Sequence, residues 1–279
     1  MRKPHHTTLL IFTINILACL VPLSALADIV FVKASTTDFH HPHDLSLDPS
    51  GRWLFVADMN NDVVKILDPQ TLTIVGKIGE NELDSPHDLT FDNQGRLVVA
   101  DSGNSRLVVY ELNGKQGKAV KTIANGMSSP EGVAVDKHHN IYVANTGSHN
   151  VVQLKDGNIA LKAGGAGREI ENYIRPHDVE IWNNRLFITD PGNNRIKILN
   201  MQLQFITTLA GKSYDFNEPK YLGLDETGLL YIADQYNNQI KIFNTDYKLI
   251  DTIKSYTIDA KSISLNKPEG ILAVGLNIW

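Results

Sequence analysis

The chain has 279 residues and a formal charge of −5, with 42% hydrophobic and 20% charged residues. This hydrophobic content is enough for a substantial core, and the charged fraction is below that of disordered chains, so general disorder is excluded. The acidic balance offers no long-range attraction to phosphate backbones, which argues against a nucleic-acid partner. The composition therefore favours one large, ordered all-β domain over two smaller domains.

Residues 1–27 have the pattern of an export signal. The basic start MRK precedes a mostly apolar run, Leu9–Leu23, and Ala25-Leu26-Ala27 is a small-x-small cleavage site. Polar residues and a proline interrupt the run, so it makes a poor permanent membrane span. The sequence predicts a signal peptide at 1–27 and a mature chain, 28–279, that is periplasmic or secreted and has no membrane span. The alternatives are an uncleaved signal-anchor and lipid attachment at Cys19, the single cysteine.

The mature chain is a repeat. Six prolines, spaced 44, 44, 46, 43 and 49 residues apart, begin similar segments: Pro42, Pro86, Pro130, Pro176, Pro219 and Pro268. A period in the forties with several short strands per unit is typical of β-propeller blades.

Each unit contains runs of strand type. In the second unit these runs are Asp88–Asp92, Arg96–Ala100 and Arg106–Tyr110, separated by Asn-Gln-Gly and Ser-Gly-Asn-Ser. A fourth run, such as Leu72–Ile78 in the first unit, precedes the next proline. Four antiparallel strands make one sheet with two apolar faces, which only neighbouring copies can bury, so the units should close into a six-bladed ring. The run Ile29–Ser35 is then expected to be an outer strand donated to the last blade.

The sixth unit is expected to be incomplete. In the second, third and fifth units the Ala-Asp or Ala-Asn step lies 14 residues after the proline, whereas the sequence stops at Trp279, before that point in the sixth unit. An unpaired apolar edge there would promote aggregation. The alternatives are an incomplete ring, a gap filled by another segment or a partner chain, and a truncated reading frame, which we favour.

The repeated residues resemble the NHL repeat. Pro130-Glu131-Gly132-Val133-Ala134-Val135-Asp136 is close to its Pro-x-Gly-Val-Ala-Val-Asp pattern, and the later Asn-x-Arg step recurs, with Asn104 and Arg106 in the second unit. The resemblance covers Pro42 to Trp279 and implies a six-bladed propeller. It is weak for function, because one propeller fold supports many activities.

The residue after each proline is the strongest candidate for chemistry. In a closed propeller, equivalent positions on the innermost strands converge on the central channel. These positions hold three imidazoles, two carboxylates and one ammonium: His43, His87, Glu131, His177, Lys220 and Glu269. Titratable groups gathered in a concavity indicate a binding or active site.

A divalent metal is one interpretation of this ring. Two histidines and one carboxylate form a known catalytic zinc set. Because His87, His177 and Glu269 come from the second, fourth and sixth blades, they could approach one ion symmetrically. The alternative is that these residues only cap strands or bind channel water, and Lys220 opposes a cation.

The Pro-His-Asp steps also resemble those of peptidyl-hydroxyglycine amidating lyases, which hold zinc with three such histidines and calcium with the help of an Asp. Residues 42–44, 86–88 and 176–178 are similar to those steps, so the resemblance implies His43, His87, His177, Asp88 and Asp178 as metal residues. It also implies Tyr236 as the catalytic tyrosine, in a register where Glu269 replaces one zinc histidine. The histidines here do not fall on alternate blades, and the family's two active-site arginines have no counterpart.

Three other features are better explained by solvated loops. His40 and His41 lie between blades, where exposure to solvent is expected. His138 and His139 occupy a turn position. Gly164–Gly167 is glycine-rich, but no helix follows that could bind phosphate.

The sequence favours an exported module that binds a peptide, glycan or protein across its central face, because blades with variable loops form a broad rigid surface. One alternative is a metal-dependent lyase or hydrolase that uses zinc or calcium. The other is an accessory propeller that docks a partner enzyme.

Overall fold

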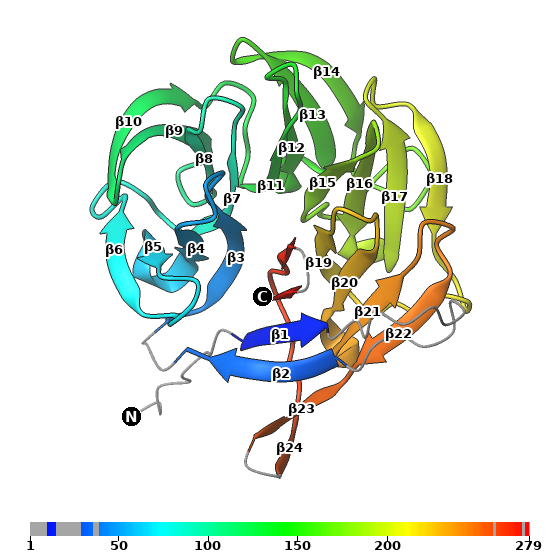
Figure 1. The fold of residues 1–279 in the computed structure, drawn as a ribbon. Coiled ribbons are helices and arrows are strands. Elements are labelled where there is room, and N and C mark those ends of the chain that lie inside the picture. Colours follow the sequence, from blue (N-terminus) through cyan, green and yellow to red (C-terminus); the bar gives the residue numbers. More distant parts are fainter. Residues whose placement is uncertain (1–9, 15–28, 36–38, 259–260, 275–276, 279) are drawn as a thin grey trace, which may run out of the picture.

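The computed structural model describes residues 10–14, 29–35, 39–258, 261–274 and 277–278, and it is an all-β propeller with four-stranded antiparallel blades (Figure 1). Five blades each consist of four consecutive strands. Blade 1 contains β3 (Pro42–Leu47), β4 (Leu54–Asp58), β5 (Val63–Leu67) and β6 (Ile74–Ile78). Blade 2 contains β7 (Pro86–Phe91), β8 (Leu97–Asp101), β9 (Arg106–Asn113) and β10 (Gln116–Ile123).

The other three consecutive blades repeat this order. Blade 3 contains β11 (Pro130–Val135), β12 (Ile141–Asn145), β13 (Asn150–Lys155) and β14 (Asn158–Gly164). Blade 4 contains β15 (Val179–Trp182), β16 (Arg185–Asp190), β17 (Arg195–Asn200) and β18 (Phe205–Leu209). Blade 5 contains β19 (Pro219–Leu224), β20 (Leu230–Asp234), β21 (Gln239–Phe243) and β22 (Leu249–Ile253). The predicted strands therefore exist, with ends displaced by up to three residues.

A further four-stranded sheet combines segments from both ends of the sequence. Its order is β2-β1-β26-β25, with β1 at Leu10–Ile14, β2 at Ile29–Ala34, β25 at Ala273–Val274 and β26 at Asn277–Ile278. The predicted outer strand after residue 28 is thus β2, at the edge of this sheet. β1 lies between β2 and β26, at a position for which the sequence predicted no strand. β1 lies within residues 1–27, which the sequence predicts to be removed as a signal peptide. The structure does not test that removal, so cleavage after residue 27 stays a prediction.

A hairpin precedes the last two strands. It consists of β23 (Ser255–Ile258) and β24 (Lys261–Ser264), which pair only with each other and project from the ring in Figure 1. This insertion accounts for the longest spacing between prolines. The part of the chain that the structure describes contains no helix long and apolar enough to span a membrane.

The core lies between adjacent blades. Strands β4, β8 and β20 are buried along their whole length, because each packs against a neighbouring blade on both faces. One cluster joins Phe55 and Val64 of blade 1 to Leu89 and Val99 of blade 2. Each such side chain contributes about 1.5–3 kcal/mol by leaving water, so blade-to-blade burial holds the ring together.

A buried acid or amide ends the second strand of each consecutive blade and fixes the loop that leads into the anchoring proline of the same blade. Asp101 Oδ1 accepts a hydrogen bond from Asp84 N at 2.7 Å, and its Oδ2 pairs with Arg106 Nε at 2.6 Å. The equivalent acceptors are Asp58, Asn145, Asp190 and Asp234. The Ala-Asp and Asn-x-Arg steps of the repeat therefore position the residues that face the channel.

Candidate functional site

The chain turns sharply into each innermost strand. The residue before every anchoring proline has a positive φ, between 41° and 69°: His41, Ser85, Ser129, Arg175, Glu218 and Lys267. None of these is glycine, so each conformation costs free energy that the surrounding hydrogen bonds must offset. The shared turn places the residue after each proline in the same position of its blade, at the channel.

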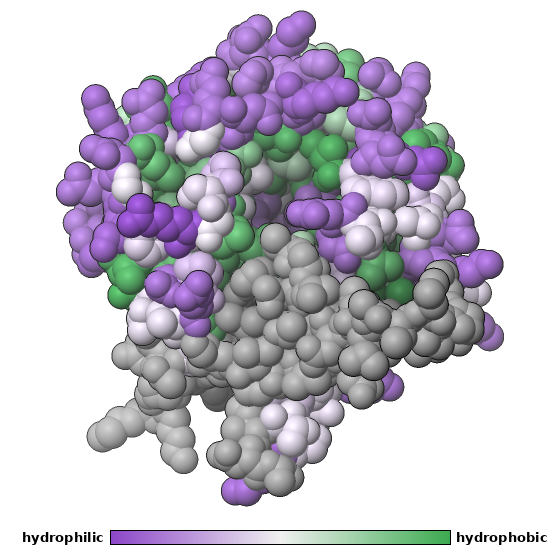
Figure 2. All heavy atoms as spheres, viewed as in Figure 1, coloured by the Kyte–Doolittle hydropathy of each residue, from purple (hydrophilic) through white to green (hydrophobic). Residues whose placement is uncertain are grey.

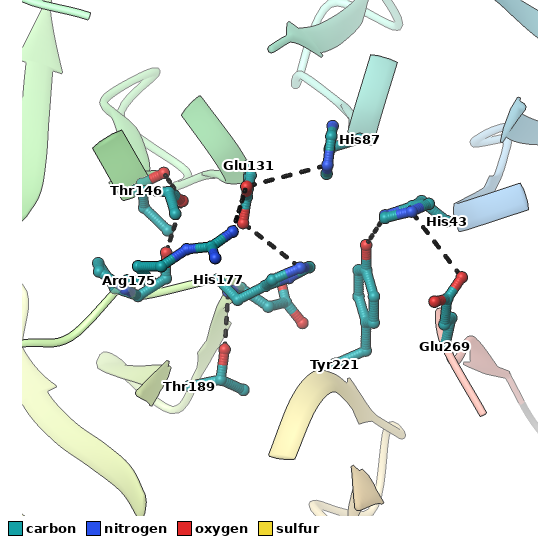
Figure 3. Close-up of polar contacts among 12 residues, drawn as sticks. His43, His87, Glu131, Thr146, Arg175, His177, Thr189, Tyr221 and Glu269 are labelled. Carbon is teal, nitrogen blue, oxygen red and sulfur yellow. Dashed lines mark hydrogen bonds and ion pairs between the residues drawn. The ribbon is translucent and has the colours of Figure 1, made fainter. Parts of the chain in front are cut away.

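Three imidazoles from blades 1, 2 and 4 meet at the channel mouth (Figure 3). The ring of His43 lies 4.4 Å from that of His87 and 6.3 Å from that of His177, centroid to centroid. The rings of His87 and His177 are 6.2 Å apart. The convergence expected from the repeat is therefore present, and it brings together residues up to 134 positions apart in the sequence. Figure 2 shows a hollow at the middle of the ring, bordered by both hydrophobic and hydrophilic residues.

The two carboxylates divide the imidazoles into two groups. Glu131 Oε2 lies 3.3 Å from His177 Nε2, and Glu131 Oε1 lies 3.9 Å from His87 Nε2. Glu269 lies on the other side, where its Oε2 is 3.9 Å from His43 Nε2. The grouping of His87, His177 and Glu269 around one point, expected from threefold spacing, is thus not the one in the structure: Glu131 occupies the place beside His87 and His177.

His41 belongs to the second group. Its Nδ1 lies 3.1 Å from His43 Nε2, and its Nε2 lies 3.5 Å from Glu269 Oε1. The sequence placed His41 with His40 in a solvated loop; His40 is exposed, but the positive φ at His41 brings its side chain to the channel. Possible ligand atoms of His41, His43 and Glu269 all lie within 4.8 Å of one another.

Burial keeps the imidazoles neutral. It lowers the pKa of His87 to about 4 and holds the pKa of His43 and His177 well below 6.5. The same loss of solvation raises the pKa of Glu131 and of Glu269 to about 7. Near neutral pH the site therefore offers unprotonated nitrogens and two carboxyl groups poised to ionise.

Two buried polar atoms at the mouth make no hydrogen bond to the described residues, although one of them, Glu131 Oε2, lies 3.3 Å from His177 Nε2. They are His177 Nδ1 and Glu131 Oε2, on side chains whose residues are 5% and 7% exposed. An unpaired buried polar group costs about 1–3 kcal/mol, so the site is incomplete without a ligand or ordered water.

The aspartates after the histidines form a layer of carboxyl groups with a different role. Asp88 Oδ2 accepts a hydrogen bond from Val133 N of blade 3 at 2.5 Å, and Asp178 Oδ2 accepts one from Leu222 N of blade 5 at 2.7 Å. Burial raises the pKa of both, and Asp44 shares a hydrogen bond with Asp88. The two carboxylates predicted as metal residues thus tie neighbouring blades together.

The tyrosine that contacts the imidazoles is Tyr221, not the expected Tyr236. Tyr221 Oη lies 2.6 Å from His43 Nδ1, and its ring centroid is 4.7 Å from that of His177. Tyr236 is 45% exposed, and Lys267 Nζ lies 4.6 Å from the centre of its ring. Sequence reasoning missed Tyr221, although it stands where other repeats have Gly or Asp, and that irregularity was a usable signal.

The remaining sequence candidates lie where they were expected. His138 and His139 are exposed in a turn. The segment 164–167 leads to an isolated bridge between Ala166 and Tyr173 and is followed by no helix.

The donor set at the mouth fits a transition metal. Imidazole nitrogens and a carboxylate suit zinc, and a three-donor set leaves a position for water or a ligand. If His43 ligates through Nε2, its Nδ1–H donates to Tyr221 Oη, which is the outer hydrogen bond that orients a metal-bound histidine.

The fold is a β-propeller, and two of its blades contain a recognised repeat. The family model described as NHL repeat matches residues 83–110 and 127–154, which span most of blades 2 and 3, so the chain contains NHL repeats. A search of curated proteins finds no match.

Several solved structures share the fold. The propeller in a nidogen/laminin complex is 18% identical, with a TM-score of 0.67 over 95% of this chain and 98% of that one. A streptogramin B lyase is 15% identical, with a TM-score of 0.65 over 88% of this chain and 77% of that one. A catalytically inactive variant of virginiamycin B lyase from Staphylococcus aureus, with quinupristin, is 12% identical, with a TM-score of 0.63 over 92% of this chain and 85% of that one. At these identities the likeness shows the fold alone.

Proposed function

We propose that this protein is a metal-dependent binding propeller, which holds a divalent cation, zinc by its donor chemistry, with His41, His43 and Glu269 and takes up its ligand at the central face. The single observation that carries the proposal is that possible ligand atoms of these three residues lie within 4.8 Å of one another. His41 and His43 are two residues apart, but Glu269 comes from the opposite end of the repeat region, so local sequence does not explain its meeting with the two histidines.

The surroundings of the three residues support a metal centre. Neutral imidazoles bind a cation without first losing a proton, and burial keeps the pKa of His43 well below 6.5. Glu269 is also fixed by Gln235 Nε2, which donates to its Oε1 at 3.0 Å. When bound, the cation would supply Lewis acidity and a coordination position for an oxygen of the ligand.

The proposal is for binding rather than for lyase chemistry. The lyase resemblance implies Tyr236 as the catalytic tyrosine, whereas Tyr236 packs against Lys267 and Tyr221 contacts His43 instead. The ligand class that the sequence favours, a peptide, glycan or protein, fits a propeller whose loops surround a hollow. The propeller of the nidogen/laminin complex is a similar fold found in a protein assembly.

Two structural points belong to the same proposal. We propose that the composite sheet β2-β1-β26-β25 serves as the sixth blade, because it supplies the four strands that a blade needs. Export to the periplasm or the medium rests on residues 1–27. If they are removed, β1 is lost and β2, β25 and β26 alone form the sixth blade, so mass spectrometry of the protein recovered from secreted and periplasmic fractions tests both export and the four-stranded sixth blade.

Zinc titration of the full chain tests the metal proposal. Calorimetry should show about one equivalent bound to the metal-free protein, with at least tenfold weaker binding in His43→Ala and in Glu269→Gln. The matched control is His138→Ala, an exposed turn histidine that should bind zinc as the wild type does. Binding that is unchanged in the first two variants, or absent from the folded wild type, would overturn the assignment.

A further inference from the structure

Lys220 is a cation at the channel mouth, and its surroundings differ from those of the other largely buried cations of the described blades. Lys220 follows the anchoring proline of blade 5 and is half-buried. Among the described residues it makes no hydrogen bond and no ion pair within 4.0 Å, although two carboxylates share the ring with it.

Three other cations of the described blades that are largely buried are each paired with a carboxylate. Lys65 Nζ lies 2.5 Å from Asp58 Oδ2, Lys241 Nζ lies 2.9 Å from Asp234 Oδ2, and Arg195 Nε lies 2.7 Å from Asp190 Oδ2. Lys197, which is 1% exposed, has no carboxylate within 4.0 Å among the described residues, but it donates to Asn172 O at 3.3 Å and lies 3.7 Å from the centre of the Tyr173 ring. A buried cation of these blades therefore has either a carboxylate or a carbonyl oxygen and an aromatic ring as its partner. The ammonium group of Lys220 has neither among the described residues.

The charge of Lys220 affects the pKa of titratable residues on several blades at the mouth. After the larger effect of burial, its charge lowers the pKa of His41, His87 and His177. It also opposes the rise in the pKa of Glu131 and Glu269. The ammonium group therefore lies within electrostatic reach of both carboxyl groups without pairing with either.

A second cation lies at the rim. Arg175 precedes the anchoring proline of blade 4, has a side chain that is 69% exposed, and approaches Glu131 Oε1 only to 3.9 Å. With a divalent ion on His41, His43 and Glu269, the mouth keeps an excess of positive charge even when Glu131 and Glu269 are both ionised. A low-dielectric concavity with such an excess attracts anions.

We propose that the ligand of this site carries an oxyanion group, a carboxylate or a phosphate, which pairs with Lys220 and has Arg175 at its outer edge. The ammonium supplies a point charge with three donors, and the guanidinium can add a bidentate contact. This inference rests on the proposed function for the position of the ligand, but the anion contact itself needs only Lys220.

Calorimetric titration with acetate and with inorganic phosphate tests the proposal, at constant ionic strength, on metal-free protein and on protein loaded with one equivalent of zinc. At least one anion should bind the wild type and bind Lys220→Gln at least tenfold more weakly. Lys220→Arg keeps the charge and should bind within a few-fold of the wild type. The matched control is Lys162→Gln, on the exposed outer strand β14 of blade 3, which should not change binding.

The outcomes separate the two proposals. Anion binding that depends on Lys220 in a protein that takes up no zinc would support the oxyanion site and remove the metal. Zinc uptake without measurable binding of either anion, or anion binding equal in Lys220→Gln and wild type, would overturn the oxyanion site. Preference for phosphate over acetate, or the reverse, identifies the group that the ligand carries.

Discussion

Replacing His87 with glutamine should change how the stability of the protein depends on pH. His87 is part-buried at the mouth, and its Nδ1 lies 2.9 Å from the carbonyl oxygen of Ser85, to which it can donate. Burial lowers its pKa from 6.5 to about 4. The unfolded chain therefore takes up a proton at this residue between pH 6.5 and 4, whereas the folded chain does not.

The sign and size of the effect follow from proton linkage. Stability falls as the pH is lowered wherever the unfolded state binds more protons, so the His87 contribution is near zero at pH 7.5 and grows unfavourable below pH 6.5. For a shift of this size the loss is about 2 kcal/mol at pH 5 and about 3 kcal/mol at pH 4. His87→Gln removes this loss, so its free energy of unfolding relative to wild type should rise by these amounts on acidification.

Urea unfolding at pH 7.5, 6 and 5 measures this difference directly. The control is His138→Gln, because His138 is exposed in a turn and its replacement should give the same difference from wild type at each pH. The buried carboxyl groups of the channel affect both proteins alike and cancel from the comparison. If the difference between His87→Gln and wild type does not change between pH 7.5 and 5, His87 is not held neutral and the account of the site is wrong.

Three further predictions concern the supports of the site. Asp190→Ala leaves the buried Arg195 without its 2.7 Å partner and should cost about 3–5 kcal/mol in urea unfolding, whereas Lys77→Ala, which breaks the exposed Lys77–Glu80 pair, should cost less than about 1 kcal/mol. Gly132→Ala would place a Cβ 2.6 Å from Asp178 Cα in the next blade and should destabilise the protein by about 1–3 kcal/mol; a thermal melt equal to wild type would show that the blades separate without cost. Tyr221→Phe removes the partner of His43 Nδ1 and should weaken zinc binding about 10–100-fold while leaving the fold intact; unchanged zinc affinity would exclude an orienting role.

The sequence by itself determined the all-β propeller and its four-stranded antiparallel blades, although the structure has five blades of consecutive strands where six blades were predicted. Six prolines at nearly constant spacing, alternating apolar runs and glycine or asparagine turns are local signals, and each repeat independently supports the others. The convergence of His43, His87, Glu131, His177 and Glu269 also followed from the repeat, because equivalent positions of a closed ring must face the same axis. The buried Asp101 and its equivalents show why the Ala-Asp step recurs.

Only the tertiary structure decided which of these groups meet. Their distances depend on the turn before each proline and on the rotation of each blade, and neither quantity is encoded in spacing alone. The positive φ of His41, 69°, places its side chain at the channel, whereas the sequence predicted a solvated loop there. Asp88 was predicted as a metal residue, but it accepts a hydrogen bond from Val133 N and so joins blades 2 and 3. In the same way Tyr221 replaced Tyr236 beside the imidazoles, because its place on the innermost strand of blade 5 brings it to His43, whereas Tyr236 lies in the exposed turn after the second strand.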